Sequence, residues 1–167
     1  MKEINFRTDI LPLKDRLFKM SLRITQNNEE AEDIVQETLI RLWNERSKWQ
    51  LISNIVSYSM TICRNLSLDY LRHKENQNIT LNSSLHDCAD SMPMPDEALQ
   101  NDERQASVAK IINNLPEKQR TVVQLRDIEG MSYKEIASIL EISESDVKVT
   151  LYRAREVLRK RLEIHKL

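Results

Sequence analysis

The sequence predicts an all-α protein of two small helical modules joined by an acidic linker, the C-terminal module being a helix-turn-helix. A single glycine and four prolines among 167 residues leave too few turn residues for a β-rich chain. Apolar side chains recur every three or four residues, which is typical of amphipathic helices. Net charge is +2 over residues 1–74, −7 over residues 75–103 and +4 over residues 104–167. We therefore expect independently packed modules at 1–74 and 96–167, with a flexible linker at 75–95.

The first module begins with a helix over residues 9–26. Its apolar stripe consists of Ile10, Leu13, Leu17, Met20 and Ile24. The pair Asn27-Asn28 interrupts this stripe, and Asn28 can cap a second helix that runs to about Arg46. The first turn of that helix, residues 29–33, is rich in acid, which complements the positive end of the helix dipole.

The second helix has two dissimilar faces. Its core face carries Ala31, Ile34, Val35, Thr38, Leu39 and Leu42. Its other face carries Asp33, Gln36, Glu37, Ile40 and Asn44, with Trp43 at the border. An isoleucine among polar residues, beside a tryptophan, indicates a docking surface for another protein. The alternative is a single exposed apolar residue of the kind common on protein surfaces.

A third helix is expected from about Ser53 to His73. Its predicted core stripe is Ile55, Tyr58, Ile62, Leu66 and Tyr70. Arg64 and Arg72 face elsewhere, and Trp49 lies just before the helix. Aromatic side chains together with arginines can form a stacking and electrostatic platform for single-stranded DNA. Ordinary packing and solvated charge would give the same pattern.

The second module is expected to consist of a helix from Asp96 to Asn113, a helix from Glu117 to Ile128, and a helix-turn-helix. Pro116 suits the start of the middle helix, and Gly130 ends it. Ser132 and Glu135 then form a capping box ahead of a short apolar stripe, Ile136, Ala137 and Leu140.

A turn through residues 141–143 leads to the last helix, where Ser143 and Asp146 again have capping spacing. Its core positions are Val147, Leu151, Ala154, Leu158 and Leu162. Its opposite face carries Ser145, Val149, Tyr152, Arg153, Glu156 and Lys160, with Lys148 on the flank. Long donors at the start of such a helix suit the reading of base edges in the major groove. The alternative is a helical hairpin with a solvated charged face.

Other classes of function have little support. No apolar run is long enough to span a bilayer, and the N-terminus has no signal-peptide core. Cys63 and Cys88 lie far apart without a CxxC pair, so neither a disulfide framework nor a metal site is expected. No catalytic arrangement or glycine-rich phosphate loop is present. We expect a cytoplasmic protein that is not an enzyme and uses no cofactor.

Two segments together resemble the bacterial RNA polymerase sigma factors. AEDIVQETLIRLW at 31–43 and SYSMTICRNLSLDYLR at 57–72 are similar to region 2 of the sigma-70 family. LPEKQRTVVQLRDIEGMSYKEIASIL, beginning at Leu115, and DVKVTLYRAREVLRKRL, ending at Leu162, are similar to region 4. With only a short connector between these regions, the chain resembles the extracytoplasmic-function (ECF) group.

The resemblance implies a promoter-specificity factor that binds core RNA polymerase and directs transcription initiation. The implied polymerase-binding residues are Asp33, Gln36, Glu37, Ile40 and Trp43. The implied contacts to the −10 promoter element are Trp49, Arg64, Asn65 and Arg72. The implied −35 readers on the last helix are Ser145, Asp146, Lys148, Val149, Tyr152 and Arg153. The implied partners are core RNA polymerase, promoter DNA and an anti-sigma factor.

Two departures and two alternatives accompany the resemblance. Glu141 stands in the turn where the family usually has glycine, so a left-handed backbone there would be strained by about 1 kcal/mol. Asp146 stands where threonine or asparagine is common. One alternative is a DNA-binding regulator that acts without polymerase, which leaves residues 31–43 unexplained. The other is a sigma-like protein that binds only an anti-sigma partner.

Overall fold

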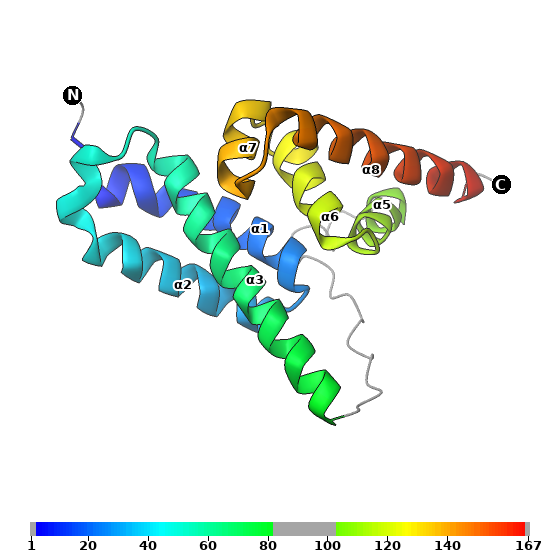
Figure 1. Ribbon diagram of the computed structural model, residues 1–167, viewed down its shortest axis with the longest axis horizontal. Helices are drawn as coiled ribbons and strands as arrows, with labels where there is room; N and C mark the ends of the chain where they lie inside the picture. Colours follow the sequence, from blue (N-terminus) through cyan, green and yellow to red (C-terminus); the bar gives the residue numbers. More distant parts are fainter. Residues whose placement is uncertain (1–2, 82–102, 166–167) are drawn as a thin grey trace.

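The structure, a computed structural model, describes residues 3–81 and 103–165, and every regular element in these ranges is helical. The first module contains η1 (Phe6–Ile10), η2 (Leu11–Leu13), α1 (Lys14–Thr25), α2 (Asn28–Asn44), η3 (Arg46–Leu51) and α3 (Ile55–Leu81). The second contains α5 (Glu103–Asn113), α6 (Glu117–Val123), η5 (Gln124–Ile128), α7 (Tyr133–Leu140) and α8 (Glu144–His165). The all-α prediction and the two helical modules are confirmed (Figure 1).

Helix α1 lies at the centre of the first module. The stripe expected from the sequence is buried throughout, and Leu17, Met20 and Ile24 are fully inaccessible. The chain before Lys14 is not α-helical, because a π-helical turn and a 3-10 turn containing Pro12 precede it. Asn27, rather than the predicted Asn28, caps α2: its Oδ1 accepts from Glu30 N at 3.0 Å.

The predicted core stripe of α3 packs against the core but is not the most buried face of the helix. Its apolar members, such as Ile62 and Leu66, are only half-buried, whereas Met60, Cys63 and Ser67 are buried. The Ser67 hydroxyl bonds the Ser21 hydroxyl of α1 at 2.9 Å and also donates to Cys63 O within α3. Small side chains with satisfied hydroxyls allow α1 and α3 to pack closely, and a count of apolar residues does not detect such a face.

The helices on either side of the linker have other limits than expected. Helix α3 continues to Leu81, so residues 75–81, predicted as the start of the linker, are helical. Helix α5 begins at Glu103, and the remainder of the predicted 75–95 linker and the predicted helix start at Asp96 lie outside the described residues. No proline or glycine follows His73 before residue 81, so nothing in the chain stops the helix there.

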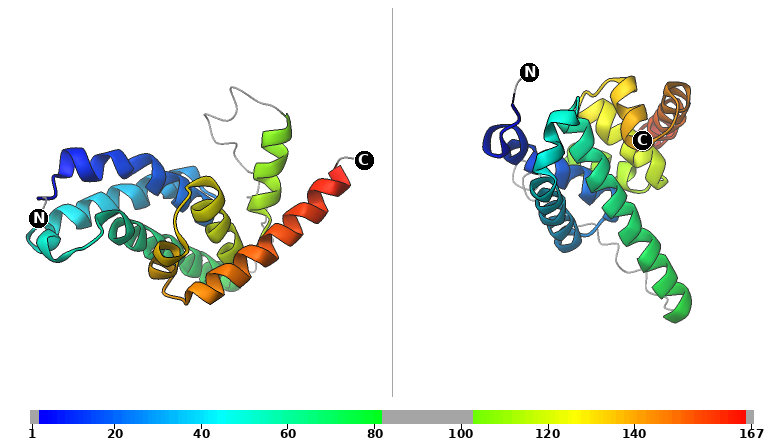
Figure 2. Two further views of the ribbon diagram at one scale, coloured as in Figure 1. Left: turned by 90° about the horizontal axis from the view of Figure 1, so that it is seen from above. Right: turned by 60° about the vertical axis from the view of Figure 1, so that its left-hand side comes forward.

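The two modules pack against each other, contrary to the expected independent packing. One continuous apolar cluster includes Leu17 and Met60 of the first module and Val122, Ile136 and Leu151 of the second. The contacts join α1 to α6 and α3 to α7. In Figures 1 and 2, α2 lies on the side of the first module away from α8, and α8 extends beyond the docked modules to the C-terminus.

Candidate nucleic-acid and polymerase interfaces

The helix-turn-helix is fixed by caps at both of its junctions. Ser132 Oγ accepts from Glu135 N, and the Glu135 carboxylate accepts from Ser132 N, each at 3.1 Å, which completes the predicted capping box. Ser143 Oγ accepts from Asp146 N at 3.0 Å at the start of α8. Between the helices, Glu141 adopts φ 57°. This is the left-handed conformation in which a residue with a side chain is expected to be strained. The tight turn therefore sets the angle between α7 and α8.

The face of α8 opposite the core is open along its first three turns. Val147, Leu151 and Ala154 are buried, as predicted, and hold the helix on the module. All six predicted −35 readers are exposed: Ser145, Asp146, Lys148, Val149, Tyr152 and Arg153. Tyr152 is 67% exposed and Val149 44%, so large apolar side chains stand beside two cations. Such a face can contact thymine methyl groups and donate to guanine.

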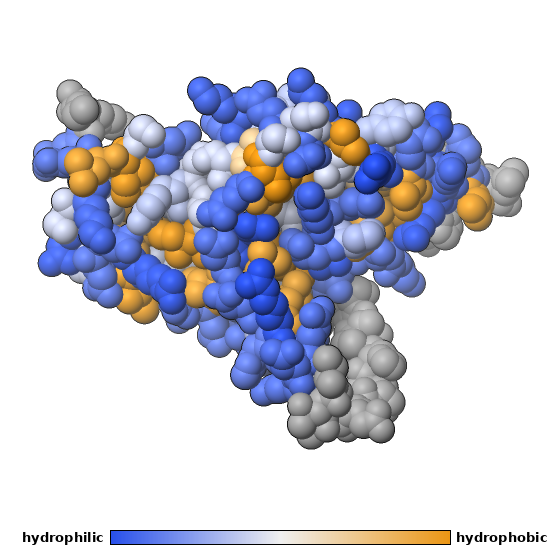
Figure 3. Space-filling model, in the orientation of Figure 1, coloured by the Kyte–Doolittle hydropathy of each residue, from blue (hydrophilic) through white to orange (hydrophobic). Residues whose placement is uncertain are grey.

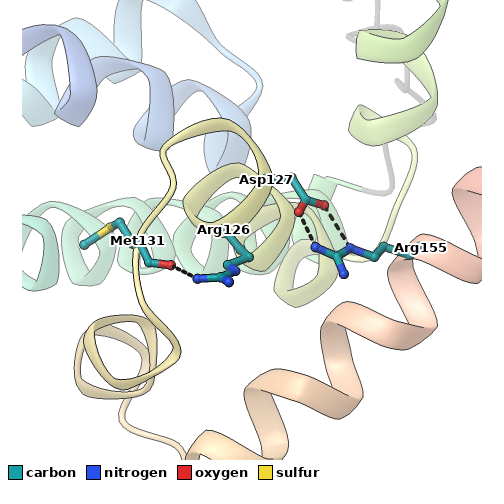
Figure 4. Close-up of polar contacts among 4 residues, drawn as sticks. All are labelled: Arg126, Asp127, Met131 and Arg155. Atoms are coloured by element: carbon teal, nitrogen blue, oxygen red, sulfur yellow. Dashed lines mark hydrogen bonds and ion pairs between the residues drawn. The ribbon is translucent and has the colours of Figure 1, made fainter.

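An ion pair anchors α8 to the helix preceding the helix-turn-helix. Arg155 donates from Nη2 to Asp127 Oδ1 at 2.5 Å and from Nε to Oδ2 at 3.3 Å, a two-pronged contact (Figure 4). The hydrogen bond that Arg155 donates to Asp127 raises the pKa of the guanidinium, and desolvation by burial opposes this. Arg155 is therefore used in orienting α8.

Three residues beside the exposed face of α8 form a cluster that helical periodicity in the sequence does not reveal. The Arg126 guanidinium lies 4.3 Å from the centre of the Tyr133 ring, and the Lys148 ammonium lies 5.4 Å from it. Arg126 Nη1 also donates to Met131 O at 2.8 Å (Figure 4). The ring thus holds one predicted −35 reader near a second cation. These residues lie 7 to 22 positions apart in the sequence and meet only through the turns at Gly130 and Glu141.

The outward face of α2 is formed as predicted. All five implied polymerase-binding residues are exposed, with Ile40 at 58% and Trp43 at 47%. Apolar surface is visible over α2 and the segment that follows it at the left end of Figure 3, and further apolar patches lie in the middle of this view and along α8. Glu37 pairs with Arg41 at 3.0 Å within the helix. An apolar centre with a charged surround suits protein docking.

Sequence reasoning missed the contribution of the N-terminal segment to this end of the module. The Phe6 ring lies 5.4 Å from Trp43 edge to face and 6.4 Å from Trp49 in a stacked arrangement. Arg46 lies over the Trp43 ring at 4.6 Å. An open depression of about 630 Å³ lies between these side chains and residues 3–7 and Leu11.

The four predicted −10 contacts differ in how exposed their side chains are. Trp49 is only 8% exposed, and its indole donates to Leu42 O at 3.0 Å, so its proposed stacking on DNA is wrong for this conformation. Arg64 is half-buried, and its Nε is buried without a hydrogen-bond partner. Asn65 and Arg72 are exposed, and Arg72 lies 3.7 Å from Asp69. The exposed apolar residue in this region is Leu51, at 87%.

Three features of the described part of the chain concern metals, membranes and thiols. No cluster of three or more His, Cys, Asp or Glu there could bind a metal. No helix within residues 3–81 and 103–165 is long and apolar enough to cross a membrane. Cys63 is buried and not in a disulfide, and its desolvation raises its pKa to about 12.

Comparisons with known proteins match both modules. The family Sigma-70 region 2 matches residues 10–77, and Sigma-70, region 4 matches residues 105–158. The chain is 31% identical over 160 residues to ECF RNA polymerase sigma factor SigW of Bacillus subtilis, covering 89% of this chain and 84% of that protein. It is 30% identical over 152 residues to SigX of the same organism, covering 89% and 78%.

Two solved structures share the fold. The sigma factor RpoE, crystallised in complex with the anti-sigma factor NepR from Bartonella quintana, matches with a TM-score of 0.81 at 23% identity. That match covers 95% of this chain and 97% of RpoE. CnrH, in complex with the cytosolic domain of CnrY, matches with a TM-score of 0.67 at 21% identity over 93% of this chain and 85% of CnrH.

Proposed function

This chain belongs to the ECF group of RNA polymerase sigma factors, and we propose that its three exposed helix faces divide the work of promoter selection. As a sigma factor, it binds core RNA polymerase and directs transcription initiation at promoters. In our proposal, the outward face of α2 docks on the polymerase, α8 reads the −35 element and α3 contacts the −10 element.

The observation that carries this proposal is the combination of two different kinds of exposed face on one chain. The α2 face is apolar at its centre, with Ile40 and Trp43 exposed beside Asp33, Gln36 and Glu37, which suits a protein partner. The α8 face carries hydrogen-bond donors and an exposed tyrosine on a helix held by a tight turn, which suits the major groove. A DNA-binding regulator acting alone would leave the α2 face without a purpose.

For the −10 element, the proposal rests on fewer residues than the sequence suggested. Asn65 and Arg72 are exposed on α3 and are available to single-stranded DNA, whereas Trp49 has a packing role. Arg64 can join them only if its buried Nε is uncovered.

Membership of the family also leads us to propose the absence of enzymatic activity, the location of the protein and an anti-sigma partner. The polymerase supplies the chemistry, so this chain is not an enzyme and needs no cofactor. Transcription takes place in the bacterial cytoplasm, where we place the protein. NepR and CnrY are the partners named in the complexes of the two similar sigma factors, and we expect this chain to have an anti-sigma factor as well.

Promoter-specific transcription with purified core polymerase tests the proposal. Initiation should require this protein, and Ile40→Asp should weaken core binding by about 30-fold or more if Ile40 is a hot spot, with the helical content kept. The matched control is Ile164→Asp, which adds the same charge at a site 69% exposed near the end of α8. Promoter binding without core-dependent initiation would favour a regulator acting alone, and equal core binding by both variants would remove α2 from the docking site.

A further inference from the structure

The N-terminal segment forms a short turn that is held by its own polar groups. Asn5 Oδ1 accepts from Arg7 N at 2.9 Å and from Thr8 N at 3.3 Å, which caps η1. Asn5 N donates to the Asp9 carboxylate, and Asp9 N donates to Asn5 O, each at 2.8 Å. The backbone from which the Phe6 side chain projects is therefore fixed by local hydrogen bonds.

The Phe6 side chain joins a buried tryptophan to an exposed one. Its ring lies 6.4 Å from Trp49 with the planes 9° apart, and 5.4 Å from Trp43 with the planes 76° apart. Trp49 belongs to a buried cluster with Ile10 and Leu42, and Phe6 packs against that cluster. Figures 1 and 2 show the N-terminal turn beside the end of α2 and the segment that follows it. Phe6 thus rests on a fixed surface and contacts Trp43 from there.

Trp43 is confined by its neighbours although it is 47% exposed. The rings of Phe6 and Trp49 contact it edge to face, at 5.4 Å and 6.4 Å. The Arg46 guanidinium lies 4.6 Å from the ring centre, and Arg46 Nη1 donates to Trp43 O at 2.9 Å. Docking on a side chain that is already ordered avoids the entropy cost of ordering it on binding. The surroundings of Trp43 therefore favour its use in binding.

The exposed part of Trp43 connects two surfaces of the molecule. On α2 it lies one turn from Ile40, in the face proposed to bind polymerase. It also lines the open depression of about 630 Å³, together with Phe6 and Arg46. The depression is thus continuous with the α2 face, and the N-terminal turn forms part of its wall.

We propose that Phe6 is a positioning residue for polymerase docking, which holds Trp43 in the orientation that core polymerase binds. The inference rests on the proposed docking of the α2 face on polymerase. It adds the N-terminal turn to a docking surface that the sequence placed on α2 alone. Phe6 acts through Trp43, so its loss should matter only while Trp43 is present.

A double-mutant cycle on the affinity for core polymerase tests this dependence. Phe6→Ala should weaken core binding about fivefold when Trp43 is present, and less than about twofold in the Trp43→Ala background. A role in stability alone would lower the folded fraction, and with it the affinity, by the same factor in both backgrounds. Phe6→Tyr, which keeps the ring, should restore binding to within about twofold of the wild type. The matched control is Ile62→Ala, which trims the same apolar cluster from α3 and should leave core binding within about twofold.

The orientation of Trp43 can be followed without polymerase by fluorine NMR of the free protein labelled with fluorinated tryptophan. The chain contains 2 tryptophans, and Trp43→Ala assigns their resonances. Phe6→Ala should move the Trp43 resonance towards its position in the denatured protein, because the ring contact is lost. Phe6→Tyr and Ile62→Ala should leave that resonance close to its wild-type position.

Three results would overturn the positioning role: equal loss of core affinity in both backgrounds, wild-type core affinity of Phe6→Ala, or an unmoved Trp43 resonance. If far-UV circular dichroism shows that Phe6→Ala does not fold, Phe6→Leu takes its place and the same results decide. Failure of the Phe6 cycle alone would leave the α2 face as the docking site. If Trp43→Ala and Ile40→Asp both bound core polymerase like the wild type, the proposed docking face itself would be refuted, and the positioning role with it.

Discussion

The backbone at Glu141 offers a direct measurement of strain in the helix-turn-helix. The residue has φ 57° and ends α7 in a Schellman arrangement, with Ile142 N donating to Ala137 O at 3.1 Å. A left-handed conformation costs a residue with a side chain about 1–2 kcal/mol. Glycine avoids this cost. Its greater conformational freedom in the unfolded chain, however, lowers the free energy of unfolding by about 0.4–1 kcal/mol. We expect Glu141→Gly to stabilise the protein by about 0.5–1 kcal/mol.

The assay is equilibrium unfolding in urea, with thermal unfolding as a second measure. For a chain of this length, 1 kcal/mol corresponds to about 2–4 °C in Tm. Glu141→Ala is the matched control, because it removes the same exposed carboxylate while keeping a Cβ at positive φ. It should change the free energy of unfolding by less than about 0.5 kcal/mol. If Glu141→Gly proves no more stable than Glu141→Ala, the turn is not strained and the reasoning fails.

Three further predictions concern the second module and the buried thiol. Lys148→Ala and Arg153→Ala should each weaken −35 recognition by about 1–3 kcal/mol if they read bases, with core binding kept, and Lys134→Ala should not; equal transcription by all three variants in a promoter-competition assay would place the reading face elsewhere. A double-mutant cycle of Asp127→Ala and Arg155→Ala should give a coupling below about 1 kcal/mol that shrinks with salt, because both side chains are partly exposed; a larger, salt-independent coupling would contradict this. Burial raises the pKa of the Cys63 thiol to about 12, so it should react with iodoacetamide at pH 8 about a thousandfold more slowly in the native than in the denatured Cys88→Ser protein. Because the folded pKa is raised, this thiol favours folding below about pH 9, and the contribution declines as pH rises towards 12; a native alkylation rate equal to the denatured rate would refute the burial.

Local signals in the sequence identified the exposed helix faces well. The spacing of Ser132 and Glu135 predicted a capping box whose two hydrogen bonds are both present. Helical periodicity correctly distinguished the buried Val147 and Leu151 from the exposed Tyr152 on α8. It also predicted that Ile40 on α2 is exposed. These features succeed because each depends on residues within one or two helical turns.

Features that depend on contacts between distant segments were not predictable in this way. Ser67 and Cys63 form the contact face of α3, because small side chains with internal hydrogen-bond partners can be buried against α1. From the sequence, Trp49 is a candidate for stacking on DNA. In the structure its indole is inside the core and donates to Leu42 O. Arg23 and Arg120 look like surface charges in the sequence, and only the three-dimensional arrangement shows that backbone carbonyls and amides satisfy them.

Several cations are engaged in contacts within the protein, and this limits how strongly the free protein binds DNA. Arg120 is buried on carbonyl groups, Arg126 donates to Met131 O, and Arg155 and Arg159 pair with acids of the same module. The candidate reading face carries two cations, Lys148 and Arg153, beside the acid Asp146.

Each phosphate that the protein neutralises contributes about 0.9 to the slope of log affinity against log salt. We therefore expect a slope of about −2 for the free protein on a promoter duplex, measured by fluorescence anisotropy between low and moderate salt. Core polymerase should raise the affinity by fixing the separation of the two modules, which converts the second contact into an intramolecular one. A slope steeper than about −4 for the free protein would show that arginines now used in internal contacts bind phosphate instead, and that the docked structure is not the DNA-binding form.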